Sequence, residues 1–506
     1  MMVLALTAQA AIAAMEPVHD AVARIAGYRF GDSRETLTVV EDMAREALSD
    51  DALREALEAA LVDLLGGEAT YESKDFACRQ LAILGGPAAV PALVALLRTP
   101  DTADMARYAL QVMPCVEANQ ALLDALGSVA EPVQIGIINS LGERRDAASV
   151  ETLASYAMAS DPALAEGAIY ALGKIGNAAA LDALLSVQPH VASALQRAVA
   201  DALILCAEEL AMDGEAQRAA AVFESLFDPA QPATVRIAAF QGLIVSRPDT
   251  GLALLIDVLT GADAALYGPA VATLPYFPDT DVTKAVADCL GRMAPNAQEM
   301  LVSALGERGD AAALEPVAAM VQSDSQEVRI AALTALGALG DAQTVRPLAK
   351  AAAKSEGRER QSARNSLYGL QASGVDDAII HGIRRGNAAL RIEYIRAASE
   401  RGIDDAKPAL FRAAKARRVE VRNAACRALT NLAGDGDLNA ALDLLRSAKS
   451  DASLAEAEKV AAAAAARTRS AEACDAALGA ALESAKKENL KAAIQRIIDA
   501  VTTDKK

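Results

Sequence analysis

Leucine recurs along most of this chain at a nearly constant interval, and the apolar residues around it follow the period of an α-helix. In 324–354 this pattern predicts one helix that ends near Leu339 and a second that begins near Thr344. If Leu336 is taken as an anchor, the equivalent positions along the chain are Leu81, Leu110, Leu141, Leu172, Leu203, Leu243, Leu274, Leu305, Leu367, Ala398 and Leu429. Successive anchors are 29, 31, 31, 31 and 40 residues apart, and then 31 apart six times. This series indicates a structural repeat.

The residues after each anchor predict how one repeat folds. Nine and twelve residues after the anchor the chain is often apolar, as at Val345 and Leu348, and this spacing puts both side chains on one face of the second helix. Each repeat is then a pair of short antiparallel helices that cannot bury its apolar face alone. Because stacked pairs bury a continuous core, we expect an all-α fold, an α-solenoid of about twelve helix pairs.

The repeat resembles the short HEAT-like repeat described in phycobilin lyases, whose motif is D-x-x-V-R-x-x-A-x-x-A-L-G-x-x-G-D. The matching residues are Asp324, Val328, Arg329, Ala332, Ala335, Leu336, Gly337, Gly340 and Asp341. The resemblance covers about 75–450, and it implies a right-handed superhelix with a concave groove that binds other proteins. Residues 76–176 are also similar to exported bacterial HEAT-repeat proteins of unassigned role. Such repeats are specific for the fold, whereas their functions differ.

Breaks in the period divide the chain into segments. We expect repeats at 76–206 and 236–450, separated by a longer helical insertion at 207–235 that accounts for the 40-residue step. Residues 15–75 and 451–506 lack the strict period and are predicted to be helical caps.

The first residues have a different character. Residues 1–14 are apolar and end in small side chains, as in a secretory signal, but no Lys or Arg precedes them. We expect either a truncated signal peptide, and with it a periplasmic or secreted location, or the first apolar turn of a helix. The longest apolar run after the N-terminus, 461–466, is too short for a transmembrane segment.

Composition excludes several classes of protein. The chain of 506 residues is 53% hydrophobic and 23% charged, which excludes a disordered protein. Aromatic residues make up 3%, Trp is absent and the net charge is −18, so nucleic-acid binding is disfavoured. The six cysteines lack the C-x-x-C spacing of metal sites, and the three histidines are scattered. We therefore expect no metal ligands, no cofactor and no catalytic residues, and thus a protein that is not an enzyme.

Charged residues also recur at the repeat period. Arginines stand seven residues before five of the anchors, and we interpret them as structural bridges to carboxylates of the neighbouring repeat. They are Arg236, Arg329, Arg360, Arg391 and Arg422. Two charged stretches, 141–146 and 305–310, fall at the turn between helices and are interpreted as solvated caps.

Polar residues occur two positions before most anchors, where a buried series would be apolar. We predict that these side chains are exposed on the helices that carry the anchors and that they form a partner-binding face. The candidate residues are Arg79, Tyr108, Asn139, Tyr170, Gln241, Asn365, Arg396 and Arg427.

The C-terminal half contains a basic segment. Residues 341–430 hold 18 Lys and Arg against 10 Asp and Glu, whereas the rest of the chain has a net charge of −26. This segment suits an acidic protein, an anionic glycan or a phosphate backbone, or it neutralises the acidic half of the same chain. The leading hypothesis is a non-enzymatic scaffold for a protein partner. The alternatives are a bilin-lyase-type enzyme that holds a tetrapyrrole and a client protein, and nucleic-acid binding through 341–430.

Overall fold

A computed structural model describes residues 17–504. Within that range the chain folds into α-helices, short 3-10 helices and turns, with no β-strand. It divides into two compact units, unit 1 (Met1–Gly251) and unit 2 (Leu252–Lys506), and helix α15 (Pro248–Thr260) contains the boundary. None of the helices in this range combines the length and the apolar character that a membrane crossing requires. The predicted signal segment 1–14 lies outside the described residues.

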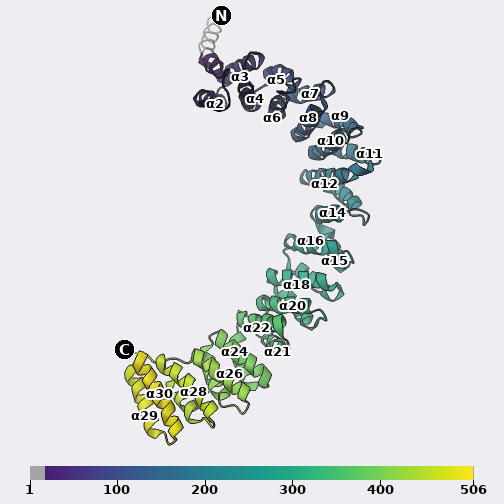
Figure 1. Cartoon of the computed structure of the whole chain (residues 1–506). Coiled ribbons are helices and arrows are strands. Elements are labelled where there is room, and N and C mark those ends of the chain that lie inside the picture. The colour runs from purple at the N-terminus through teal and green to yellow at the C-terminus, as the bar shows by residue number, and fades with distance from the viewer. Residues whose placement is uncertain (1–16, 505–506) are drawn as a thin grey trace. The chain divides into compact units, whose positions relative to one another are not determined.

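In unit 1 the even-numbered helices pack against one another as layer A, and the odd-numbered helices form layer B beside them (Figure 1). The helices of layer A are α2 (Glu35–Glu46), α4 (Tyr71–Leu84), α6 (Ala103–Val112), α8 (Glu131–Arg144), α10 (Pro162–Ile175), α12 (Gln196–Met212) and α14 (Ala233–Ser246). Those of layer B are α3 (Asp51–Gly66), α5 (Val90–Leu97), α7 (Val116–Ala125), α9 (Val150–Tyr156), α11 (Ala178–Val187) and α13 (Ala216–Leu226). A helical stretch at 17–25 precedes α2.

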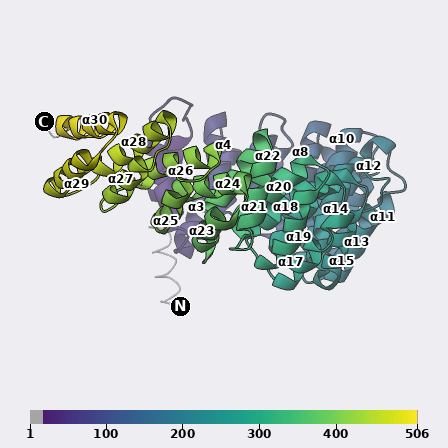
Figure 2. The ribbon, with the colours of Figure 1, turned by 90° about the horizontal axis from the view of Figure 1, so that it is seen from below.

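Unit 2 has the same two layers, with α20, α22, α24 and α26 above α21, α23 and α25 in Figure 2. Its layer A consists of α16 (Ala264–Ala272), α18 (Pro295–Arg308), α20 (Gln326–Leu339), α22 (Gly357–Gly369), α24 (Ala388–Glu400), α26 (Val419–Leu432), α28 (Asp451–Ala466) and α30 (Glu488–Asp504). Its layer B consists of α17 (Thr280–Ala287), α19 (Leu314–Ala319), α21 (Val345–Lys354), α23 (Val375–Arg385), α25 (Lys407–Ala413), α27 (Leu438–Arg446) and α29 (Ala471–Ser484).

The anchors form the core of this arrangement. All twelve are buried, eleven of them on helices of layer A, and Leu274 lies in the short 3-10 helix that follows α16. Each pair buries its anchor against the neighbouring pair, as a solenoid requires. The predicted all-α solenoid of helix pairs is therefore confirmed.

Local sequence sets the ends of the helices, as the α10–α11 pair illustrates. The Asp161 carboxylate accepts hydrogen bonds from the N–H groups of Ala163 and Leu164 at the start of α10. Gly176 ends α10 at φ +66°, a left-handed conformation that glycine adopts without steric cost. Asn177 then caps α11. The turn between the two layers is thus specified by its own residues.

Glycine after an anchor allows neighbouring helices of layer A to approach closely. A Cβ atom at Gly173 would lie 2.9 Å from the Cα atom of Ala202 in the next helix of the layer. At Gly306 it would lie 2.7 Å from the Cβ atom of Ala335. Real Cβ atoms do not pack at such distances, so the Leu-Gly pair of the repeat sets the separation between successive helices.

The irregular segments also belong to the two layers. Helix α12 continues beyond Leu203 to Met212, and a loop at 227–232 follows α13, which together produce the 40-residue step. In the segments expected to be caps, α2 packs on α4 and α28 packs on α26. Val460 lies 31 residues after Leu429 and is buried in α28, so the period continues there without a Leu-Gly pair.

The cysteines are free thiols, and five of the six are buried, whereas Cys115 is half-buried. Burial raises the pKa of the Cys78 and Cys206 thiols to about 12. Because the thiolate is the reactive form, these side chains act as small apolar residues of the core.

The close approach in layer A leads to a stability test. We expect Gly173→Ala to lower the free energy of unfolding by about 1–3 kcal/mol, because the added methyl group meets the backbone of Ala202. Gly479 lies inside α29, and no atom lies within 4 Å of a Cβ atom added there. Gly479→Ala should therefore raise the free energy of unfolding by up to about 1 kcal/mol through helix propensity. Urea unfolding followed by circular dichroism checks both values, and losses of equal size would contradict the proposed close contact.

Candidate interaction surface

The structure places all eight candidate residues on helices of layer A, and none of them is buried. Tyr170 and Arg396 are half-buried and the other six are exposed, so the predicted exposure of this position is confirmed. The residues form two series, because the chain has two compact units. The polar series of unit 1 is Arg79, Tyr108, Asn139, Tyr170 and Gln241, and the polar series of unit 2 is Asn365, Arg396 and Arg427.

Three members of the unit 1 series lie on adjacent helices. Tyr108, Asn139 and Tyr170 occupy the same repeat position on α6, α8 and α10, which pack side by side. The Tyr108 side chain is 50% exposed, and neither it nor Asn139 forms a side-chain hydrogen bond to another described residue. Burial, followed by the nearby charge of Asp201, raises the pKa of Tyr170, so its hydroxyl group stays protonated. Arg79 instead pairs with Asp75 on its own helix.

The unit 2 series is partly engaged in structural contacts. Arg396 Nη1 donates to Glu393 Oε1 at 2.9 Å, and Arg364 donates to both carboxylate oxygens of Glu393 at 2.8 Å. Glu393 is 4% exposed, so these two arginines neutralise a buried charge between α22 and α24. Asn365 accepts a hydrogen bond from Gln361, and Arg427 is exposed with a 3.4 Å contact to a carbonyl of its own helix. Arg427 is therefore the member of this series most accessible to a partner.

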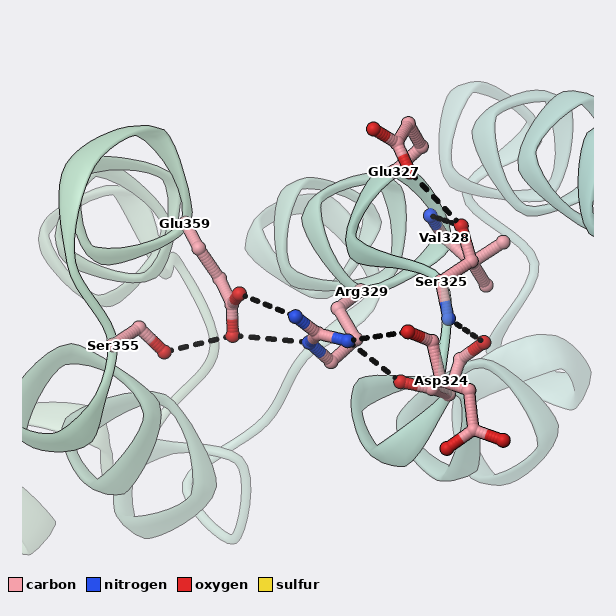
Figure 3. Close-up of polar contacts among 8 residues, drawn as sticks. Asp324, Ser325, Glu327, Val328, Arg329, Ser355 and Glu359 are labelled. Atoms are coloured by element: carbon pink, nitrogen blue, oxygen red, sulfur yellow. Dashed lines mark hydrogen bonds and ion pairs between the residues drawn. The ribbon is translucent and has the colours of Figure 1, made fainter.

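Arg329, one of the five period-matched arginines, binds in the way that the sequence suggests (Figure 3). Its Nη2 atom donates to Glu359 Oε2 in the next repeat at 3.0 Å, and its Nη1 atom donates to the carbonyl oxygens of Ser323 and Asp324. Ser355 Oγ donates to the same carboxylate at 2.7 Å. The predicted bridge to a neighbouring repeat is confirmed at this position.

Three other arginines of the series have a different partner from the one predicted. The side chains of Arg360, Arg391 and Arg422 donate to backbone carbonyl oxygens in the last turn of the preceding layer-B helix or just after it, at 2.6, 2.8 and 3.0 Å. Carbonyl groups at a helix end have no partner within the helix. The role is structural, as expected, but these acceptors are backbone groups and not carboxylates of the neighbouring repeat; Arg360 also lies 4.0 Å from Glu356 at the start of its own helix.

The two charged turns contain a contact that the sequence does not reveal. Arg144 Nη1 donates to the carbonyl oxygens of Leu110 and Met113 at 2.7 and 2.6 Å, at the end of the preceding helix of layer A. Arg308 donates to the carbonyl oxygens of Leu274 and Phe277 at 3.1 and 2.6 Å. Both arginines are half-buried, so they link successive repeats and are not fully solvated.

Within residues 17–504 no group of three or more His, Cys, Asp or Glu side chains is arranged to hold a metal ion. The polar groups described above contact one another, the backbone or solvent. The geometry on these helices is that of a repeated surface built on a buried core.

A family model of HEAT repeats matches residues 119–204, in unit 1, and residues 283–367, in unit 2. Both segments therefore contain HEAT repeats. The matched segments contain α8 to α11 and α18 to α21, with the Leu-Gly pairs and the contacts of Arg144, Arg308 and Arg329. A search of the curated proteins returned no match.

Among solved structures, the protein is similar to yeast importin-beta (Kap95p), with 14% identity over 96% of this chain and 72% of that chain and a TM-score of 0.36. It is also similar to Kap121p bound to Nup53p, with 12% identity over 90% and 56% of the two chains and a TM-score of 0.43. Human deoxyhypusine hydroxylase in complex with glycerol has 18% identity over 50% and 96%, with a TM-score of 0.25. We base no functional conclusion on these likenesses.

The Arg329–Glu359 pair predicts a dependence of stability on pH. Arg329→Met should lower the free energy of unfolding by about 1–3 kcal/mol at neutral pH, because a largely buried carboxylate loses its charged donor. The hydrogen bond from Arg329 lowers the pKa of Glu359 in the folded state. The stabilisation is therefore complete above the unfolded-state pKa of about 4.3, and it is lost as the pH falls through the lower folded-state value.

The difference in stability between wild type and Arg329→Met should thus shrink below about pH 4. Thermal melts between neutral and acidic pH measure this difference. Arg358→Met is the matched control, because Arg358 is exposed and forms no ion pair with another described residue. A difference for Arg329→Met that stays constant under acidic conditions would contradict the role of the ion pair.

Proposed function

We propose that this protein is a non-enzymatic scaffold that binds a protein partner through the polar series of its layer-A helices. The observation that supports this proposal is the alternation at each repeat, where a buried anchor is preceded by a polar or aromatic side chain that reaches solvent. An exposed series that returns at the same position on adjacent helices gives one partner several equivalent points of contact.

The residue types in unit 1 also favour protein binding. Tyrosine and arginine are enriched at the positions that contribute most to protein–protein affinity, since each combines a large apolar area with a polar tip. Tyr108 and Tyr170 stand two repeats apart with Asn139 between them. At about 8–10 Å per helix, the two rings are separated by roughly 20 Å, a span that matches an interface of ordinary size.

The test is capture and cross-linking of partners by the full-length chain in extracts of the native organism. We expect Tyr108→Ala and Tyr170→Ala together to reduce recovery of the partner at least about tenfold, because each substitution removes a large aromatic contact surface. Helicity and the melting temperature should remain as in wild type, since both side chains are at least partly solvent-exposed.

Leu185→Ala provides the matched control. Leu185 is 43% exposed on α11 in layer B, so its truncation removes a comparable apolar side chain from the other layer. Loss of the partner in this variant, with recovery unchanged in the two tyrosine variants, would show that the wrong layer has been chosen. Failure to capture any partner would contradict the scaffold proposal itself.

A further inference from the structure

Layer B of unit 2 carries an exposed series of cations on three successive helices, which we call the basic strip. Helix α21 contributes two lysines, the last turn of α23 contributes two arginines, and α25 with the turn after it contributes one of each. The basic strip consists of Lys350, Lys354, Arg384, Arg385, Arg412 and Lys415, all of them exposed.

No residue of the basic strip forms an ion pair or a side-chain hydrogen bond with another residue in the range 17–504. Three carboxylates of this part of unit 2 pair with cations outside the strip. Glu359 pairs with Arg329, Asp376 with Arg401, and Asp404 with Lys407. The strip is thus a set of cations that the fold itself leaves without counter-charges.

The spacing of the strip follows the repeat. Arg412 lies 62 residues after Lys350, which is two repeats, and Lys415 lies 31 residues after Arg384. Helices α21, α23 and α25 pack in sequence, so equivalent residues are separated by about 8–10 Å per helix. Positively charged side chains therefore recur at regular intervals along these three helices of layer B.

Charge is also segregated along α23. In α23, Asp376 and Asp377 occupy the first turn whereas Arg384 and Arg385 occupy the last, a separation of about 12 Å along the axis. Cations in a last turn complement the helix dipole, but Lys350 lies in the middle of α21 and gains little from it. The edge formed by the C-terminal halves of α21, α23 and α25 is consequently basic.

A groove opens at this edge. Its volume is about 780 Å³, and Arg346, Lys350 and Lys354 line it together with the apolar side chains of Val321 and Leu390. The Arg329–Glu359 pair of Figure 3 also forms part of its wall. A second hollow of about 480 Å³, lined in part by Lys415, lies further along unit 2. The groove thus combines a cationic rim with apolar surface.

We propose that the basic strip and its groove bind an extended acidic peptide segment of a partner protein. This inference rests on the proposed scaffold function and names the chemistry of one partner segment. An extended chain in the polyproline II conformation has three residues per turn and rises about 3.1 Å per residue, so carboxylates at every third position lie on one face about 9 Å apart and match the step of the strip. Apolar residues between the carboxylates would contact Val321 and Leu390 in the groove.

The same features disfavour a nucleic acid or a sulfated glycan as the occupant. Bases of single strands stack on exposed aromatic rings, and the large exposed aromatic side chains of the described chain are Phe30, Tyr71, Tyr108 and Tyr276, all outside 341–430. A uniformly charged polymer would leave the apolar part of the groove unused. An acidic peptide uses both parts.

The experiment measures binding of the full-length chain to a fluorescent peptide of about 13 residues with Glu at every third position and Leu or Ala between. We expect saturable binding that weakens as salt is raised. The double variant Lys350→Glu/Arg384→Glu should bind at least about tenfold more weakly. The matched control is Lys486→Glu/Lys487→Glu, which makes the same change in net charge at exposed positions after α29 and should bind as wild type does.

A charge-swapped peptide with Lys in place of Glu adds a readout that misfolding cannot produce. It should bind the Lys350→Glu/Arg384→Glu variant better than it binds wild type. Equal weakening of peptide binding in the strip and control variants would overturn the proposal. So would strip-dependent binding of duplex DNA or a heparin oligosaccharide without binding of the peptide, or the absence of binding to any of these probes.

Failure of this inference is distinguishable from failure of the scaffold proposal. If the native partner is captured in a Tyr108-dependent manner while the acidic peptide does not bind, the scaffold proposal stands and the basic strip has been misassigned. If the peptide binds through Lys350 and Arg384 but no native partner is ever captured, the groove assignment stands and the scaffold proposal loses its support.

Discussion

At four repeats a glycine directly follows the buried anchor, and there it allows neighbouring helices of layer A to approach one another closely. At Gly142, Gly173 and Gly306 an added methyl group would collide with an alanine of the next helix. This contact fixes the rotation of these helices about their axes. At about 100° per residue, the position two before an anchor lies about 160° around the helix from it. The exposure of the polar series therefore follows from the burial of the anchors.

Arginine supplies the second link between repeats, through the backbone. The last carbonyl groups of a helix have no partner within it, and a guanidinium group with several donors satisfies more than one of them. Arg144, Arg308, Arg401 and Arg467 all reach carbonyl oxygens near the end of the preceding helix of layer A. The repeat therefore uses part of its positive charge to hold successive helices together, and that part is not accessible to a ligand.

Features that depend on the type of residue could be predicted from the sequence, whereas contacts made to the backbone could not. Leucine spacing identified the helix pairs, and the polar positions before the anchors identified an exposed surface. The predicted series of anchors ended at Leu429, although the buried Val460 continues it 31 residues later. The acceptors of Arg144 and Arg308 are carbonyl groups, which every residue has, so no side chain marks them. Nor does the pattern show that the chain divides at Gly251 into two compact units.

In the basic segment, the number of charged residues does not tell which of them are available to bind a ligand. Residues 252–506 contain 33 basic and 33 acidic residues, so the whole net charge of −18 falls on 1–251. Within 341–430, Arg364 and Arg401 contribute to the local excess but are held by Glu393 and Asp376. Cations outside such pairs retain their full hydration and gain most from a new counter-charge. The capacity of this segment to bind an anion therefore depends on which cations the fold leaves unpaired, and only the packing of the helices decides that.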